Sequence, residues 1–121
     1  MSRTDDLNRI LRSLQSGTPE IEASALISED GLMIASALPN HIDEMRVAGI
    51  SSTLLSLGHR AATELARGGL EQVLIRGKDG YVVMVGAASG TMLLVLATHD
   101  AKLGLIFLDM TKAVKDISKI I

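Results

Sequence analysis

The alternation of apolar and polar positions predicts one long helix in the middle of the chain, from Asp43 to Arg67. Apolar side chains recur there every three or four residues, which places them on one side of an α-helix. They are Val47, Ile50, Leu54, Leu57, Ala61 and Leu65. We expect this apolar stripe to lie on the protein core, as in most surface helices.

The opposite side of the same helix consists mainly of small, uncharged residues. Its members are Ala48, Ser52, Leu55, Ser56, His59, Ala62, Thr63 and Ala66. A helix that faces solvent usually carries charged side chains there, whereas small residues let another helix approach closely. The pattern therefore favours a second packing surface outside the subunit. The alternative is a helix that is buried on both sides within one domain.

Two shorter patterns precede the long helix. Residues 5–15 have apolar positions at helical spacing, with Thr4 as the expected cap. Residues 21–28 and 32–37 read as two strands, and the acidic turn between them, 29–31, ends in glycine. The first part of the chain is thus predicted to form a helix and a β-hairpin.

Three strands and a last helix are predicted after the long helix. The strands span residues 71–76, 81–86 and 91–98, and Asp100 is the expected cap of the helix. The second and third strands are continuously apolar, which is typical of strands covered on both faces. Residues 71–76 include charged side chains and fit an edge strand better.

Together these elements predict an α+β fold in the order α-β-β-α-β-β-β-α. The short connections make neighbouring strands antiparallel. We expect a five-stranded antiparallel sheet with the long helix on one face and the two terminal helices on the other. A chain of 121 residues is enough for one core, so we assign residues 1–121 to a single domain.

The composition narrows the range of partners and compartments. With one Phe, one Tyr and no Trp, the chain lacks an aromatic platform for bases, and its net charge of −2 does not attract phosphate backbones. We therefore expect no nucleic acid partner. The chain has no cysteine, no signal peptide and no apolar run of membrane-spanning length. These features predict a cytoplasmic protein without membrane insertion.

No pattern of catalytic or metal-binding residues is present in the sequence. The histidines His41, His59 and His99 do not have the spacing of metal ligands. His99 and Asp100 could be read as a dyad, but a helix cap explains the aspartate more simply. The loop 86–90 joins two strands, so it offers no helix N-terminus to a phosphate. We expect no enzymatic activity, no metal and no cofactor.

Four segments in this order of elements resemble the Roadblock family, the dynein light-chain type with its bacterial and archaeal relatives. They are IEASALISEDGLMIAS, ISSTLLSLGHRAATELARGG, EQVLIRGKDGYVVMV and MLLVLAT. None of them is a catalytic signature, so the combination carries the resemblance. It is most similar to the prokaryotic branch of gliding-motility proteins that regulate small Ras-like GTPases.

The resemblance implies a homodimer in which the long helices lie side by side and the edge strands pair. Pairing would satisfy the backbone groups of an otherwise open edge. The implied dimer interface contains Ala48, Leu55, Glu71, Val73, Leu74 and Ile75.

The resemblance also implies that the long helix binds the switch region of a small Ras-like GTPase. The regulator would reposition the switch residues of the GTPase without supplying a catalytic arginine. Arg60 and Arg67 leave an arginine finger as an alternative. The implied partner-binding residues are Met45, Ser52, Ser56, His59, Ala62, Thr63 and Ala66.

Two other functions are compatible with the sequence. The chain could be a structural scaffold or adaptor subunit of a larger assembly, with no selectivity for the nucleotide state of a partner. It could also be a small-molecule sensor, although an aliphatic core offers few polar groups to recognise a ligand.

Overall fold

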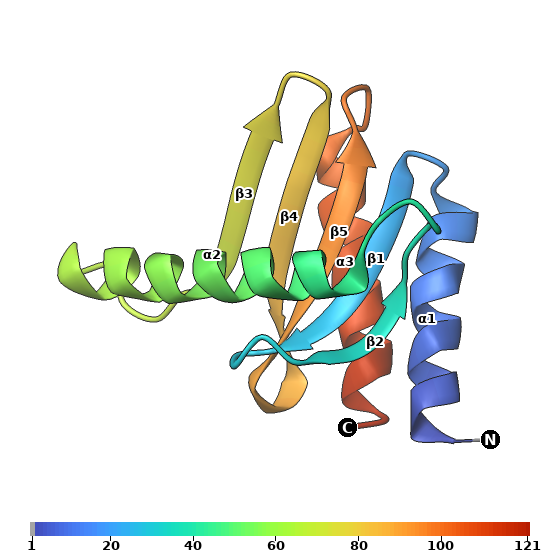
Figure 1. Ribbon diagram of the computed structural model, residues 1–121, viewed down its shortest axis with the longest axis horizontal. Coiled ribbons are helices and arrows are strands. Elements are labelled where there is room, and N and C mark those ends of the chain that lie inside the picture. Colours follow the sequence, from blue (N-terminus) through green and yellow to red (C-terminus); the bar gives the residue numbers. More distant parts are fainter. Residues whose placement is uncertain (1) are drawn as a thin grey trace.

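The computed structural model describes residues 2–121, which form a layered α+β fold (Figure 1). The elements in chain order are α1 (Arg3–Gly17), β1 (Ile21–Ser28), β2 (Met33–Ala37), α2 (Glu44–Glu64), β3 (Gln72–Gly77), β4 (Gly80–Ala87), the short 3-10 helix η1 (Ala88–Gly90), β5 (Thr91–Thr98) and α3 (Leu103–Ser118). The predicted order of helices and strands is confirmed.

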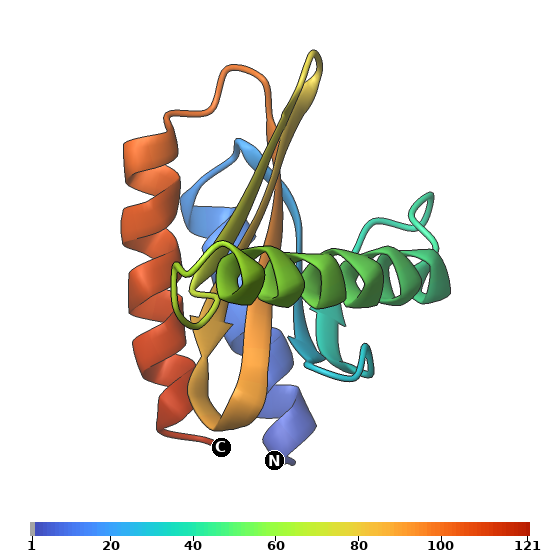
Figure 2. The same cartoon turned by 90° about the vertical axis from the view of Figure 1, so that its left-hand side faces the viewer.

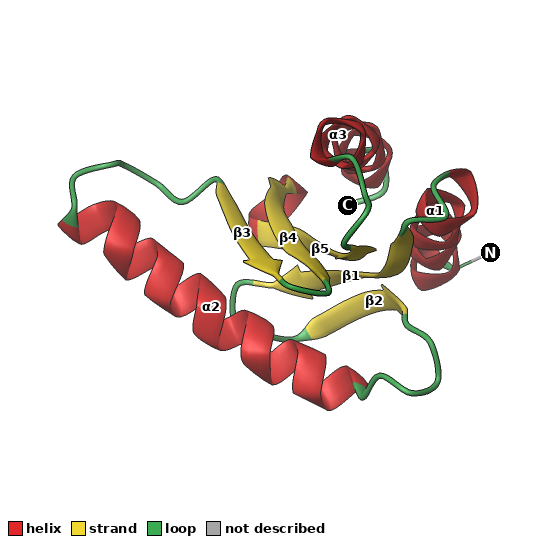
Figure 3. Ribbon diagram, turned by 90° about the horizontal axis from the view of Figure 1, so that it is seen from above, coloured by secondary structure: helices red, strands yellow, loops and turns green. Residues whose placement is uncertain are grey.

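The strands form one antiparallel sheet in the order β2-β1-β5-β4-β3. Helix α2 lies on one face, and α1 and α3 lie on the other (Figure 3). Figure 2 shows the layers from the side, where α3 runs roughly along the strands and α2 runs across them. Both the predicted layers and the predicted edge strand, β3, are therefore confirmed.

Each face of the sheet has its own apolar cluster. The cluster under α1 and α3 includes Leu7, Leu11, Leu26, Val83, Leu93, Val95, Ile106, Met110 and Ile117. The cluster under α2 includes Ala25, Ile27, Leu55, Met84, Met92 and Leu94. Strands β4 and β5 contribute alternate residues to the two clusters, which explains why their sequences are continuously apolar.

Two helix caps differ from the predicted ones. Ser2, rather than Thr4, caps α1: its hydroxyl accepts a hydrogen bond from the Asp5 N–H at 3.1 Å, and the Asp5 carboxylate accepts one from the Ser2 N–H at 3.4 Å. Helix α3 begins only after Lys102, so Asp100 does not cap it. Both predictions were wrong because a cap was chosen by residue type, while the first helical turn is set by packing.

Asp100 instead belongs to the turn that follows β5. The hydroxyl of Thr98 donates a hydrogen bond to the Asp100 carboxylate. This bond is the main reason why the pKa of Asp100 lies below its ordinary value, and a backbone hydrogen bond and the nearby His99 act in the same direction. Asp100 thus has a structural role in this turn, which differs from the helix cap expected from the sequence.

The rotation of α2 about its axis also differs from the prediction. Ile50, Leu57 and Leu65, expected on the core, are 55%, 61% and 67% exposed. Leu55, expected on the opposite side, is only 1% exposed, and Ser51 is also buried. The sheet-facing row therefore centres on Ser51 and Leu55. Of the expected apolar stripe, Val47 and Leu54 still pack against the core, whereas its other large side chains lie exposed on one flank of the helix.

Small residues in the sheet-facing row explain this rotation. A Cβ atom on Gly58 would lie 3.0 Å from Leu70 and 3.5 Å from Val73, so the backbone of α2 approaches β3 closely here. The close approach leaves little room for a larger side chain at Gly58, and Ile50, Leu57 and Leu65 lie on the flank of the helix instead. None of the helices in residues 2–121 has both the length and the apolar character needed to cross a membrane.

Candidate partner-binding surfaces

The C-terminal turns of α2 extend beyond the edge of the sheet. Figure 1 shows α2 crossing the strands and continuing past β3, the last strand on that side. After Gly58, which contacts β3, every residue of the helix is exposed except Ala62, which is half-buried. This segment, residues 59–64, has no strand of its own subunit beneath it.

One flank of α2 is apolar and borders an uncovered part of the sheet. Helical spacing places Leu54, Ile50 and Leu57 on the same side of α2. Leu54 packs against the α2-side cluster together with Val82 and Leu96, which are only partly buried. Beyond α2, none of the described helices covers this face of strands β3, β4 and β5 (Figure 1). We call this area the seam surface, and it consists of Ile50, Leu54, Leu57, Ile75, Val82 and Leu96.

The other flank of α2 faces the turn between β1 and β2. A Cβ atom on Gly31 of this turn would lie 2.6 Å from the Cβ of Ser52, so turn and helix are in direct contact. We call this side the partner flank, and it consists of Met45, Ala48, Ser52, Ser56, His59 and Thr63. Two hollows border it: one is lined by Gly31, Leu32, Met33, Glu44, Met45, Ala48 and Gly49, and the other by Ser52, Thr53, Ser56, Leu57 and Arg60.

Replacement of Gly31 by alanine tests this contact. The new Cβ would collide with Ser52, and Gly31 has a φ of +85°, which disfavours any other residue. We expect Gly31→Ala to lower the free energy of unfolding by about 2 to 3 kcal/mol, measured by urea denaturation. Gly17→Ala is the matched control, because a Cβ there meets nothing within 4 Å. Equal stability of both variants would contradict the contact.

The two edges of the sheet differ in their exposure. At the β2 edge, the Ser36 N–H donates a hydrogen bond to the Asn8 side chain at 3.2 Å, and α1 packs against the strand. At the β3 edge, Leu74 and Ile75 are exposed, and no element lies outside the strand (Figure 1). Strand β3 is thus the open edge of the sheet.

The hydrogen-bond pattern shows which backbone groups of β3 point outward. The Gly86 N–H donates to the Glu71 carbonyl at 3.1 Å, and the register pairs Val73 with Met84. In an antiparallel pair such bonds occur at every second residue. Val73 and Ile75 therefore direct their backbone groups to β4, whereas Gln72, Leu74 and Arg76 direct theirs away from the sheet.

The residues expected at a dimer interface lie in different places in the structure, and one of them is buried. Glu71, Leu74 and Ile75 lie exposed at the open edge, and Val73 is half-buried beside α2. Leu55 is buried inside the subunit, so its assignment to an interface was wrong. Ala48 is half-buried and lies by the β1–β2 turn, away from the seam surface.

Five of the seven residues expected to bind a partner lie on the partner flank, whereas Ala62 belongs to the sheet-facing row and Ala66 follows the helix. Met45, Ser56, His59 and Thr63 are exposed. Ser52 and Ala62 are half-buried, and Ala66 follows the end of the helix with a φ of 58°. The sequence analysis missed the exposure of Ile50, Leu57 and Leu65. The signal for it was the row of Ser51, Leu55, Gly58 and Ala62, which has the spacing of a closely packed helix face.

The charged residues on and after the last turn of α2 contact groups of their own subunit. Within residues 2–121, no three His, Asp or Glu side chains come together as metal ligands. Arg60 forms an ion pair with Glu64 at 3.7 Å, and the Arg67 side chain donates to the Leu65 carbonyl at 3.0 Å. What the surface offers is exposed apolar and small polar side chains, which suit contact with another protein.

Comparison with known proteins shows which sequences and structures this chain resembles. The family model described as the Roadblock/LC7 domain matches residues 7–97. A relative in Methanocaldococcus jannaschii is 37% identical over 111 residues, which cover 92% of this chain and 96% of the relative. A Roadblock/LC7 domain from Streptomyces avermitilis superposes with a TM-score of 0.86 at 26% identity, over 93% of this chain and 94% of that one. MglB from Myxococcus xanthus superposes with a TM-score of 0.89 at 20% identity, over 99% of this chain and 90% of that one.

Proposed function

Because the chain belongs to the Roadblock/LC7 family, we propose that it is a homodimeric, non-catalytic regulator of a small Ras-like GTPase. The observation that carries this proposal is the division of α2 into two exposed flanks. The seam surface suits a second copy of the chain, and the partner flank stays free for a GTPase.

The open edge and the projecting end of α2 support the homodimer. Antiparallel pairing of two β3 strands about a two-fold axis normal to the sheet keeps both α2 helices on the same face. Residues 59–64 span about 9 Å at 1.5 Å per residue, or about two strand spacings of 4.8 Å. In such a dimer the projecting end of each helix would cover the uncovered strands of its twin and bury Ile50 and Leu57.

A GTPase bound on the partner flank would be regulated by differential binding. A surface that binds the hydrolysis-competent arrangement of the switch loops more tightly increases the population of that arrangement. The increase is about tenfold for each 1.4 kcal/mol of difference in binding free energy. No catalytic group of the regulator is needed for this effect. Ser52, Ser56, His59 and Thr63 would provide small polar contacts to the switch region.

Hydrolysis of GTP by a Ras-like GTPase from the same organism, with and without this protein, tests the proposal. Binding to the GTP-loaded and GDP-loaded forms is measured alongside. We expect faster hydrolysis and tighter binding of the GTP form. Equal binding of both forms without stimulation would instead support the scaffold function, and binding of neither form would refute both.

Arg60 and Arg67 should contribute little to the stimulated rate. Each is engaged by a group of its own subunit, and an arginine finger would have to be free to enter the active site of the GTPase. We expect Arg60→Ala and Arg67→Ala to change stimulated hydrolysis by no more than about threefold, whereas loss of an arginine finger costs roughly a thousandfold or more. Single-turnover GTP hydrolysis distinguishes the two results.

A further inference from the structure

The hollow between the β1–β2 turn and the start of α2 has a chemical character different from the rest of the partner flank. Leu32 from the turn and Met45 from the helix are among its lining residues, and they are 66% and 83% exposed. Large apolar side chains this exposed, side by side, are typical of a contact site. The flexible thioether of methionine also adapts easily to the shape of a bound group.

Hydrogen bonds hold the two walls of this hollow in place. On the turn, the Leu32 N–H donates to the Ser28 hydroxyl at 3.0 Å, and the Gly31 N–H donates to the Ser28 carbonyl at 3.0 Å. On the helix side, the Ser36 hydroxyl donates to Glu44 at 2.9 Å. The hollow is therefore preformed, and binding would require little ordering of the chain.

Gly49 lines the hollow on the side of α2. It is an exposed residue of α2, and a Cβ atom there would meet nothing within 4 Å. The packing of this subunit thus does not require glycine, although glycine weakens a helix relative to alanine. The missing side chain leaves room for a group that enters from outside.

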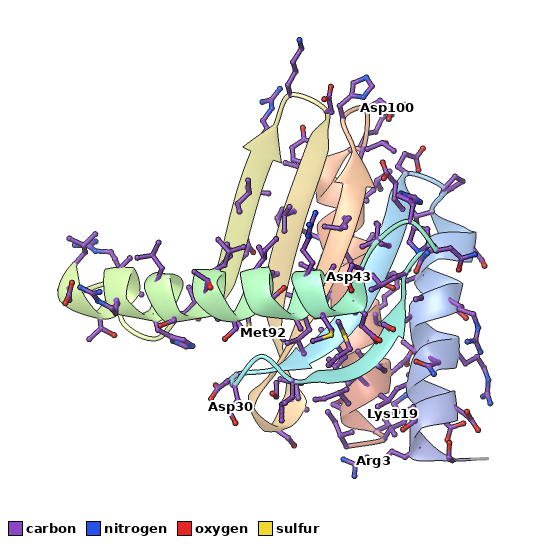
Figure 4. All side chains as sticks on the ribbon, in the orientation of Figure 1. Arg3, Asp30, Asp43, Met92, Asp100 and Lys119 are labelled. Atoms are coloured by element: carbon purple, nitrogen blue, oxygen red, sulfur yellow. The ribbon has the colours of Figure 1, made fainter. Side chains whose placement is uncertain are left out.

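Carboxylates lie beside the apolar centre. Glu44 lines the hollow, and Asp30 on the turn and Asp43 at the start of α2 adjoin its lining residues. Glu29 also lies on the turn, but its carboxylate lies near Gly90. Figure 4 shows Asp30 at the tip of the turn and Asp43 at the start of the helix, at opposite ends of this region. Within residues 2–121 none of the four forms an ion pair, and Arg46 is the one cation among residues 29–49. The region is thus negatively charged around an apolar centre.

We propose that this hollow is the anchor point for the GTPase, and that it binds an apolar side chain set among lysines or arginines on the surface of that partner. The proposal rests on the proposed function and deepens it by stating the chemistry of the contact. The apolar side chain would contact Leu32 and Met45, and the basic residues would face the carboxylates. Opposite charges at the rim of a contact mainly accelerate association and make it salt-dependent.

Three variants test this anchor. Met45→Asp replaces the apolar contact by a charge and suits the first turn of a helix, so the fold should be unaffected. Asp30→Lys reverses one charge at the rim. Leu105→Asp is the control, because Leu105 is an exposed leucine on α3, on the other face of the sheet. Dissociation constants for a GTP-loaded Ras-like GTPase from the same organism are measured at low and high salt.

We expect Met45→Asp to weaken binding at least tenfold at both salt concentrations. Asp30→Lys should weaken it several-fold at low salt and reduce the salt dependence, and Leu105→Asp should match the wild type. All variants should keep the mass of the wild type in solution. Wild-type affinity of both Met45→Asp and Asp30→Lys would overturn the anchor while leaving the regulator function intact. A wild-type protein that binds neither nucleotide form would overturn the function and the anchor together.

Discussion

Leu74→Pro should convert the proposed homodimer into a folded monomer. The backbone N–H of Leu74 points away from β4, so proline removes a donor only from the open edge of the sheet. Proline is tolerated on edge strands at positions of this kind. In a symmetric dimer the substitution is present in both β3 strands. The hydrogen bonds between the strands are lost and their carbonyl acceptors stay unpaired, which would weaken association by about 4 kcal/mol, or raise the dissociation constant roughly a thousandfold.

Val73→Pro is the matched control for this prediction. Its N–H points toward β4, so proline there breaks a hydrogen bond inside the subunit and should lower the thermal unfolding temperature markedly. Sedimentation measures the mass of each variant, and calorimetry measures its stability. A dimeric Leu74→Pro protein would refute pairing through β3. A Leu74→Pro protein that unfolds like Val73→Pro would show that the assignment of outward-facing groups is wrong.

The element order and the layers could be predicted because local patterns encode them. Continuous apolar runs in β4 and β5 required cover on both faces, and the polar residues of β3 marked an edge. The turn at Gly31 could also be predicted, since its positive φ needs a glycine. Each of these features depends on a few neighbouring residues.

The rotation of α2 could not be predicted in the same way. Periodicity finds an apolar stripe, but Ile50 and Leu57 belong to such a stripe without facing the core. Which row faces the sheet depends on how closely the helix approaches it, and this depends on tertiary contacts such as that of Gly58 with Leu70. The large apolar residues left on the flank are those that a homodimer would bury.

Only part of the proposed partner site could be predicted from the sequence, because the rest of it depends on tertiary contacts. Met45, Ser56, His59 and Thr63 lie along one exposed side of α2, as the helical spacing indicated. Leu32 was missed because it belongs to a turn, and only the tertiary contact between Gly31 and Ser52 brings it to the helix. Sequence spacing places residues on one helix face but not on neighbouring loops.

Ser56→Arg should abolish binding of the GTPase while the homodimer remains intact. Ser56 is exposed on the partner flank, where it lines one of the two hollows, and its side chain makes no hydrogen bond in the described chain. An arginine there would prevent the close approach of the GTPase surface. Its guanidinium would also lose water in the contact without gaining a hydrogen-bond acceptor, which commonly costs several kcal/mol and lowers the affinity more than about a hundredfold.

Thr111→Arg provides the comparison that makes the Ser56→Arg result specific. Thr111 is an exposed residue of α3, so the same substitution is made on a helix on the other face of the sheet. We expect Thr111→Arg to stimulate GTP hydrolysis like the wild type, and Ser56→Arg to give the unstimulated rate with unchanged mass and unfolding temperature. Full stimulation by Ser56→Arg would exclude the partner flank as the GTPase site. A loss of the dimer in Ser56→Arg would instead show that this flank, rather than the side with Ile50 and Leu57, forms the seam.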